Sequence, residues 1–404
     1  DNPRRHRIMP TELDLSRDFS VAAAQRAIHS FPALHMAALQ DKRMIRALPY
    51  QGLGNRFGLI ASAFALALVT NHSLAVSWPA KQCSVTPTSC PEKRMGRPCA
   101  PVLRKDCDPA SLADLFDVPA DVQWEPKDTV WEKATKHGKR KPMLVNRDGE
   151  KEVFSGEKVM EVKKRKAVKL MSDHYMGFAL QCNPRVAGSA LYQPHIPRGL
   201  YYGLLLEALM QRPSRKVAAR VEAVLANGTC GLGIHLRKAS KRSTQNSTKY
   251  AKLKTKLRTY AAEQGEGATV FIAADDASRE FNDELAQVAR ESGLRVLERP
   301  GNGSVTRMTT EGIIDAMAEM LVLSTCSHFV CAIHASTFSG IASARVMLRH
   351  HLAGLDVRNT TDETCAEALE MCPGIHRRRS RRLGLVQGGS TRTRRRTPAG
   401  VSDI

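Results

Sequence analysis

Short apolar runs and longer amphipathic stretches alternate along the second half of this chain. Runs suited to buried strands cover residues 230–237, 268–276, 294–299 and 327–336, and stretches with helical periodicity cover 249–263, 278–292, 311–326 and 337–349. Strands that alternate with helices in this way form a parallel sheet with helices on both faces. The pattern therefore predicts an α/β unit in this half.

The first half opens with a similar but shorter pattern. A polar lead-in with one helix around residues 21–39 comes first, and a strand, a glycine turn, a helix of small apolar residues and a second strand follow between 45 and 78. A short helix and turn is expected at 111–124, a helix at 197–210, and a new helix with Ser214 as its N-cap.

These patterns predict an α/β protein with two Rossmann-like parallel-sheet domains that face each other across a cleft. In such sheets, ligands bind at the carboxyl ends of the strands. The expected parts are a lead-in (1–43), an N-terminal Rossmann-like domain with a cysteine-rich loop and a lysine-rich insertion (44–196), a C-terminal Rossmann-like domain (197–375) and a basic disordered tail (376–404).

Positive charge is concentrated in two segments. The chain carries 61 lysines and arginines against 40 acidic residues, a formal charge of +21, and much of the excess lies in residues 127–169 and 377–396. These segments are either a polyanion-binding surface or a solvated loop and tail. Neither contains interleaved aromatic residues or a nucleic-acid-binding module, so we favour the solvated interpretation and expect no nucleic acid partner. Weak periodicity in the first segment predicts irregular structure.

The 10 cysteines and five Asn-x-Ser/Thr sequons favour the secretory lumen over a reducing cytosol. Four cysteines within 83–107 lack the spacing of a zinc ribbon and predict a disulfide-stapled loop. Of the later ones, Cys365 and Cys372 are the better disulfide candidates, and Cys326 and Cys331 are interpreted as buried thiols. No apolar run reaches the ~20 residues of a membrane span. The chain does not begin with methionine, and we expect a membrane anchor upstream of the given residues.

The glycine turn of the first unit begins like a dinucleotide fingerprint but lacks a required part. Gly52 and Gly54 have the initial spacing, yet a nicotinamide site needs an acid near the end of the second strand to bind the ribose. That strand ends Ser-Trp-Pro at 77–79, without Asp or Glu. The turn is therefore either purely structural or an anion site, in which backbone N–H groups at a helix start act with Asn55 and Arg56.

Three strand ends of the second half carry polar groups suited to a nucleoside diphosphate. One strand ends in a histidine and an arginine on the same side, a second in two aspartates, and a third in a serine and a threonine where a helix begins. Arginine binds phosphate bidentately, and the carboxyl ends of parallel strands meet at one edge of a sheet. These groups are His235, Arg237, Asp275, Asp276, Ser336 and Thr337.

These motifs resemble the fucosyltransferase superfamily with a GT-B arrangement, in particular its plant xyloglucan-type α1,2 and protein O-fucosyltransferase branches. Residues 52–79 are similar to the N-terminal signature of the plant enzymes, 233–238 (GIHLRK) resembles the H-x-R motif, and 319–342 resembles a C-terminal motif in which a helix acid precedes a Ser-Thr-Phe turn. The α1,6 branch has Arg-Arg-x-Asp after the histidine. This chain reads Arg-Lys-Ala-Ser at 237–240, so that branch is a poor match.

The resemblance implies an inverting, metal-independent transferase that moves fucose from GDP-fucose to a glycan or glycoprotein hydroxyl in the Golgi lumen. It implies no cofactor and no metal: Arg237 binds the β-phosphate and assists its departure, with Asn55 as the second catalytic residue. Glu319 stands where the family has an aspartate facing the guanine. The residues implied to bind the nucleotide sugar are Gly52, Gly54, Asn55, Arg56, His235, Arg237, Asp275, Asp276, Glu319, Ser336, Thr337 and Phe338.

Two classes of function stand at this point. The first is the transferase, for which Asp173 and Asp276 are candidate bases beside a mechanism without a dedicated base. The second is a non-catalytic basic protein that keeps a sugar-nucleotide fold and binds polyanions. The acceptor and the linkage formed are not readable from the sequence.

Overall fold

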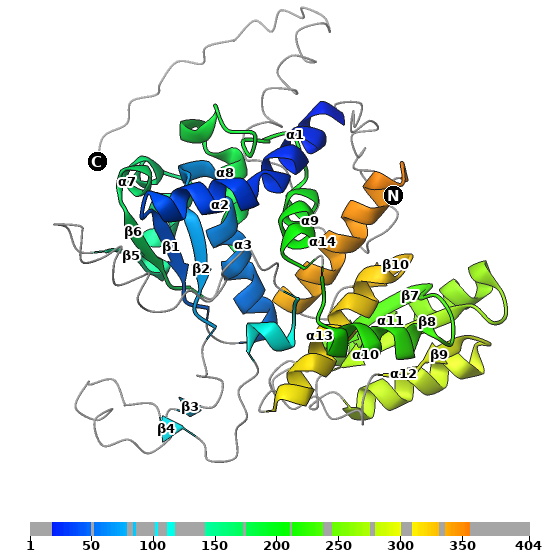
Figure 1. The fold of residues 1–404 in the computed structure, drawn as a ribbon. Helices are drawn as coiled ribbons and strands as arrows, with labels where there is room; N and C mark the ends of the chain where they lie inside the picture. The colour runs from blue at the N-terminus through cyan, green and yellow to red at the C-terminus, as the bar shows by residue number, and fades with distance from the viewer. Residues whose placement is uncertain are drawn as a thin grey trace, which may run out of the picture.

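Two sheets, each of four parallel strands, form the framework of the protein (Figure 1). The computed structural model describes residues 18–49, 52–78, 84–85, 102–103, 111–117, 142–172, 175–210, 212–236, 245–274, 279–299, 309–330 and 336–355. The first sheet has the order β2 (Ser73–Val76), β1 (Met44–Ala47), β6 (Ala167–Leu170), β5 (Met143–Val145). The second has the order β10 (His328–Val330), β7 (Leu232–Leu236), β8 (Thr269–Ala274), β9 (Arg295–Leu297). A separate antiparallel pair joins β3 (Ser84–Val85) and β4 (Val102–Leu103).

The helices follow the same division in chain order. Those associated with the first half are α1 (Asp18–His29), α2 (Phe31–Gln40), α3 (Leu53–Thr70), α6 (Arg147–Phe154), α7 (Lys158–Lys164) and α8 (Gly177–Cys182), with short 3-10 helices η2 (Leu112–Asp114) and η3 (Pro184–Val186). The later ones are α9 (Arg198–Leu209), α10 (Arg215–Leu225), α11 (Gln245–Gln264), α12 (Arg279–Glu291), α13 (Thr310–Thr325) and α14 (Thr337–Leu352).

Alternation along β8 explains why helices cover both faces of the second sheet. Val270 and Ile272 pack with α11 and α12 in one hydrophobic cluster, and Phe271 between them packs in another cluster with residues of α13 and α14. All six residues of the strand are buried, as expected for a parallel strand covered on both sides. The elements predicted for this half are present wherever the chain is described, with shorter strands than the apolar runs suggested.

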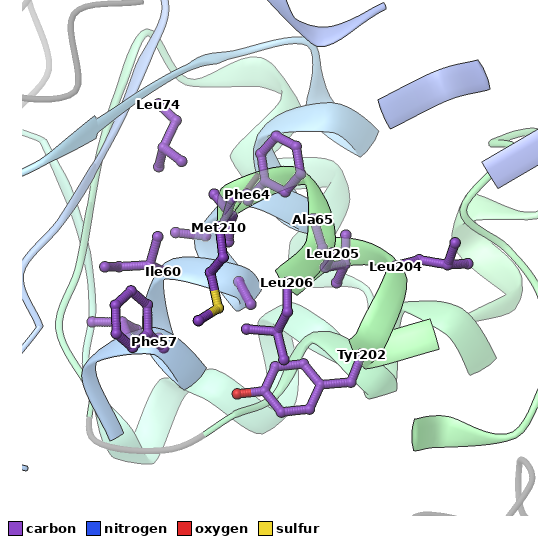
Figure 2. Packing of buried hydrophobic residues seen from close by; sticks show 14 of the residues in the cluster. Phe57, Ile60, Phe64, Ala65, Leu74, Tyr202, Leu204, Leu205, Leu206 and Met210 are labelled. Atoms are coloured by element: carbon purple, nitrogen blue, oxygen red, sulfur yellow. The ribbon is translucent and has the colours of Figure 1, made fainter. Parts of the chain in front are cut away.

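Helix α3 is the core helix of the first half. It runs for 18 residues and buries nearly all of them, and its side chains pack with those of β2 and α9 (Figure 2). By length and composition this helix could cross a membrane, but 83% of its apolar window is buried inside the protein. A helix that is hydrophobic on all its faces is buried either in a membrane or in the core of a large protein. Helix α3 lies in the core of this protein.

Helices α9 and α14 connect the two halves by close packing (Figure 1). A Cβ on Gly203 of α9 would lie 2.4 Å from the carbonyl oxygen of Ala344 on α14, so the two backbones approach as only a glycine allows. Helix α14 also packs on α3. One hydrophobic cluster therefore runs from the first sheet through α9 into α13 and α14. The domain boundary at residue 197 stays a prediction.

Two expectations about local structure are wrong. The lysine-rich segment folds into β5, α6, α7 and β6 from residue 142 onward, and β6 lies between β1 and β5 within the sheet. Its valines are buried while Leu144, Lys163 and Lys164 remain exposed, a pattern that short elements and frequent charges hide in the sequence. The single helix expected at 21–39 is two helices, because the chain breaks at Ser30, where α2 starts with Pro32 in its first turn.

Cys326 is not a free thiol. It forms a disulfide with Cys230, which links the end of α13 to the segment that enters β7. Cys182 is also disulfide-bonded. The loop cysteines at 83–107 and the pair Cys365 and Cys372 lie outside the described residues.

Candidate functional site

The N-termini of α3 and α14 meet, although 282 residues separate them in sequence. The hydroxyl of Thr337, the first residue of α14, donates a hydrogen bond of 2.5 Å to Oδ1 of Asn55 in the first turn of α3. The glycine turn of the first half and the Ser-Thr-Phe turn of the second were predicted to face one ligand. The structure brings these two turns into contact.

Gly54 allows this contact. A Cβ at this position would lie 2.5 Å from the backbone N of Phe338 and 2.6 Å from Oγ1 of Thr337. Real Cβ atoms essentially never approach other heavy atoms so closely, so a larger residue would force the helices apart. Gly54 therefore lets the starts of α3 and α14 meet, and the surrounding sequence gives no sign of this role.

Both helix N-termini are positively polarised and are not neutralised locally. Neither N-cap residue, Gly52 of α3 or Ser336 of α14, accepts a side-chain hydrogen bond from its helix, and neither first turn contains an acid. The first N–H groups of a helix have no partner within the helix and carry a partial positive charge. Two such ends at one point favour a polyvalent anion more than either end alone.

His235 brings the carboxyl end of β7 to the same place. Its Nδ1 lies 2.7 Å from Oγ of Ser339 on α14, and its ring stacks on Phe338 with centroids 4.7 Å apart. Both His235 and Ser339 are buried. Arg237 follows His235 by two residues and lies outside the described residues, since β7 ends at Leu236.

Arg56 places a buried positive charge behind the start of α3. Its side chain is 3% exposed, and its guanidinium lies 4.9 Å from the centre of the Trp78 ring. Burial lowers the pKa of Arg56 to about 10, so it stays charged at neutral pH. Trp78 was not predicted as a site residue, and its buried indole Nε1 has no hydrogen-bond partner among the described residues. The sequence feature that could have identified Trp78 is its position in the Ser-Trp-Pro sequence just after β2.

Glu319 lies near the carboxyl end of β8 and is paired with an arginine that the sequence analysis missed. Nε of Arg299 donates to Oε1 of Glu319 at 2.5 Å, and Nη2 of Arg299 donates to the carbonyl oxygen of Ala274 at 2.8 Å. Ala274 is the last residue of β8, directly before Asp275. Arg299 therefore holds a buried carboxylate against the strand end from which the two predicted aspartates continue.

Several predicted site residues cannot be placed. Asp275, Asp276 and Asp173 lie outside the described residues, as Arg237 does. Of the described ones, Gly54, Asn55, His235, Thr337 and Phe338 meet where α3, β7 and α14 converge, with the N-cap residues Gly52 and Ser336 at the two helix starts. Arg56 lies beside Trp78, and Glu319 pairs with Arg299 after β9. Within the described part of the chain, no three His, Cys, Asp or Glu side chains are grouped so that they could hold a metal ion.

Comparison with known proteins gives a fold but no sequence family. No family model matches, and no curated protein matches at the threshold used. Among solved structures, a mutant of FUT1 from Arabidopsis thaliana in complex with GDP aligns with a TM-score of 0.54 and 14% identity, over 82% of this chain and 77% of that chain. The NodZ α-1,6-fucosyltransferase soaked with GDP-fucose gives 0.44 and 14%, over 75% and 92%, and NodZ from Bradyrhizobium gives 0.41 and 15%, over 74% and 92%.

The predicted fold class is confirmed. The two separate parallel sheets and the alignment with the plant structure agree with a GT-B-like α/β fold. The chain is thus structurally similar to plant FUT1 and to NodZ at low sequence identity, and the fold rests on the plant structure.

Proposed function

We propose that this protein is an inverting, metal-independent glycosyltransferase that moves fucose from GDP-fucose to a hydroxyl of a glycan or glycoprotein. The observation that carries the proposal is the meeting of three elements: the N-termini of α3 and α14, joined through Asn55 and Thr337, and the end of β7, joined to α14 through His235. The solved structures of similar fold contain GDP or were soaked with GDP-fucose, which agrees with a nucleoside diphosphate as the ligand.

The diphosphate would bind where the two helix N-termini meet. Their N–H groups, the hydroxyl of Ser336 and the charge of Arg56 favour a ligand with several negative oxygens, while Thr337 holds Asn55 beside them. Arg237, two residues beyond His235, would contact the β-phosphate. In the reaction the bond between the anomeric carbon and the β-phosphate oxygen breaks, and negative charge grows on the departing diphosphate. A positioned guanidinium can lower such a barrier by about 3 kcal/mol or more.

The nucleoside would lie toward the carboxyl end of β8. Glu319, held by Arg299, would present its carboxylate to the base, and Asp275 or Asp276 would bind the base or ribose. Phe338 would pack against the nucleoside. The acceptor hydroxyl attacks the anomeric carbon from the opposite face, which inverts the configuration, and its proton passes to Asp173 or Asp276, or to solvent in a mechanism without a dedicated base.

The disulfides favour an oxidising compartment for this chemistry. Stable disulfides are typical of secreted and lumenal proteins, and the described chain contains Cys230–Cys326 and a bonded Cys182. Together with the sequons, they support the secretory pathway, and we propose the Golgi lumen as the site of action.

The decisive experiment is calorimetric titration of the full chain with GDP and GDP-fucose, with and without EDTA. We expect binding that EDTA leaves unchanged and that Arg237→Ala reduces at least about tenfold, because the variant loses a charge-assisted bidentate contact. Absence of GDP binding, together with heparin binding that is lost on removal of residues 376–404, would instead support the non-catalytic polyanion-binding function. Full binding by Arg237→Ala would remove the proposed role of that residue.

A further inference from the structure

Arg299 is a mostly buried arginine that uses only part of its hydrogen-bonding capacity within the described part of the chain. Its side chain is 12% exposed. Nε donates to Oε1 of Glu319 on α13, and Nη2 donates to the carbonyl oxygen of Ala274, the last residue of β8. A guanidinium has five N–H groups, all of them donors. Three of the five, including both on Nη1, make no hydrogen bond with a described residue.

The two bonds place the guanidinium at the carboxyl end of the second sheet. Ala274 is paired in register with Leu236, the last residue of β7. Neighbouring strands lie about 4.8 Å apart, and ligands of parallel sheets bind at this edge. Arg299 therefore lies at the edge where ligands bind, beside the end of the strand next to β7.

Arg299 also lies on the same face of this sheet as the contact between β7 and α14. A Cβ on Gly233, two residues before His235, would lie 2.8 Å from Sγ of Cys326 at the end of α13. Because alternate residues of a strand point to one face, His235 is on the side of α13, the helix that carries Glu319. A ligand whose diphosphate binds at the start of α14 can therefore reach Arg299 without crossing the sheet.

The unused donors of Arg299 match one feature of a purine base. Guanine has an acceptor, O6, where adenine has an amino donor, and arginine is a common partner of O6. The roles are unambiguous, because an arginine in a protein stays charged and only donates. Glu319 has further interactions in this structure, so the assignment uses the donors of Arg299 alone.

We propose that Arg299 is a specificity-determining residue, which donates a hydrogen bond from its guanidinium to O6 of the guanine of the donor nucleotide. This rests on the proposed function, because it takes GDP-fucose to be the ligand. Glu319 and Ala274 fix the position of the guanidinium, and Arg299 touches the base directly.

The experiment changes the one ligand atom that Arg299 is expected to contact. Affinities of the full chain for GDP and for 6-thio-GDP are measured by calorimetric titration. Sulfur is a weak acceptor, and the analogue keeps the N1–H and 2-amino groups, so the comparison isolates O6. We expect the wild type to bind GDP at least about tenfold more tightly than the analogue, as for one hydrogen bond to a charged group.

Arg299→Met should lose this preference. We expect its GDP affinity to fall at least about tenfold, while its affinity for 6-thio-GDP changes little, so that the two become nearly equal. Equal losses for both nucleotides would indicate general damage to the fold and overturn the contact with O6. Arg299→Lys is the second variant if the methionine variant does not fold. It keeps a positive charge beside Glu319 but lacks the fork of donors, so the preference should narrow, and an unchanged preference would overturn the contact.

Arg220→Met is the matched control on the same helix. Nε of Arg220 on α10 lies 3.2 Å from Oδ1 of Asp315, one turn before Glu319 on α13. The variant loses an ion pair with this helix but should keep the wild-type preference for GDP over 6-thio-GDP. Loss of the preference in this variant would mean that damage to α13, and not the donors of Arg299, sets the preference.

The results also separate this inference from the proposed function. If the wild type binds no GDP, the proposed function fails and the role of Arg299 toward guanine fails with it. If the wild type binds GDP and 6-thio-GDP equally, only the role of Arg299 is overturned. A wild-type preference that persists in Arg299→Met would likewise overturn it alone.

Discussion

Replacing Gly54 by alanine tests whether the contact between α3 and α14 belongs to the ligand site. The new Cβ would lie 2.5 Å from the backbone N of Phe338, whereas ordinary van der Waals contact begins at 3.4 Å. The two helix starts must therefore separate by about 0.9 Å. The neighbouring atoms belong to backbone or to the helix-opening Thr337, so a simple side-chain rotation cannot relieve the clash.

The cost divides between stability and binding. Overpacking in a well-packed region costs about 1–3 kcal/mol, and the better helix propensity of alanine returns up to about 1 kcal/mol. We expect the free energy of unfolding to fall by about 1–2 kcal/mol after both effects. Binding should suffer as well, because the helix N–H groups that would contact the diphosphate move apart with the helices, and one hydrogen bond to a charged group is worth about 1.5–3 kcal/mol. GDP affinity should therefore fall at least about tenfold.

Gly340→Ala is the matched control, because Gly340 lies on α14 and a Cβ there would meet no atom of the described residues within 4 Å. It should keep or slightly raise stability and leave GDP binding unchanged. Urea unfolding and calorimetric titration of both variants measure the two effects. If Gly54→Ala binds GDP as the wild type does, the contact between the two helices is not part of the ligand site, and the reasoning is refuted.

Three further predictions concern stability. Replacing Cys230 and Cys326 by serine should lower the free energy of unfolding by about 4 kcal/mol, since the disulfide closes a sequence separation of 96 residues; urea unfolding in the absence of reductant measures this, and no change would mean that the unfolded chain is not constrained by this bond. Arg299→Met should cost about 3 kcal/mol because it removes the cation beside the buried carboxylate of Glu319. The double variant with Glu319→Gln should recover most of the loss, and failure to do so would exclude the ion pair as its cause. Burial lowers the pKa of His72 from 6.5 to about 4, and the charge of Arg43 has a smaller effect in the same direction. The stability that the neutral His72 ring provides is therefore complete above pH 6.5 and is lost as the pH falls toward 4. Between pH 7 and pH 5 this loss should reach about 2 kcal/mol, and unfolding curves of His72→Gln at the two pH values should show that much less pH dependence.

The second sheet could be predicted from the sequence because its signals are local. Residues 270–274 form an uninterrupted apolar run, and the helix after it alternates charged and apolar positions with a helical period. Local period and length are sufficient to identify such elements. The strands of the lysine-rich segment were missed because β5 and β6 are short and are separated by two short helices rich in charge. Only their tertiary burial distinguishes them from a solvated loop.

The site was predictable in part for the same reason. His235 and Thr337 are visible as polar residues at the ends of apolar runs, and the structure brings both to one place. Arg299 and Ser339 have no local signal, because each meets a side chain placed by tertiary packing: Arg299 contacts Glu319 on α13, and Ser339 contacts the ring of His235. The hydrophobic pattern along the chain shows which side chains are buried, but it does not show which buried side chains contact each other.

The distance between the two helix starts is set away from the site itself. Helix α14 packs on α9 at Gly203, where its carbonyl backbone leaves no room for a Cβ, and α9 in turn packs on α3. These three helices thus form a continuous frame within one hydrophobic cluster, and a change at Gly203 would shift α14 along its whole length. The close contacts at Gly54 and Gly203 are therefore two constraints on one arrangement: the first sets how near the polarised helix ends can come, and the second fixes the axis along which α14 approaches. Since interiors packed at this density transmit displacement rather than absorb it, the geometry of the proposed anion site depends on a glycine of the neighbouring helix α9, far from the two helix starts.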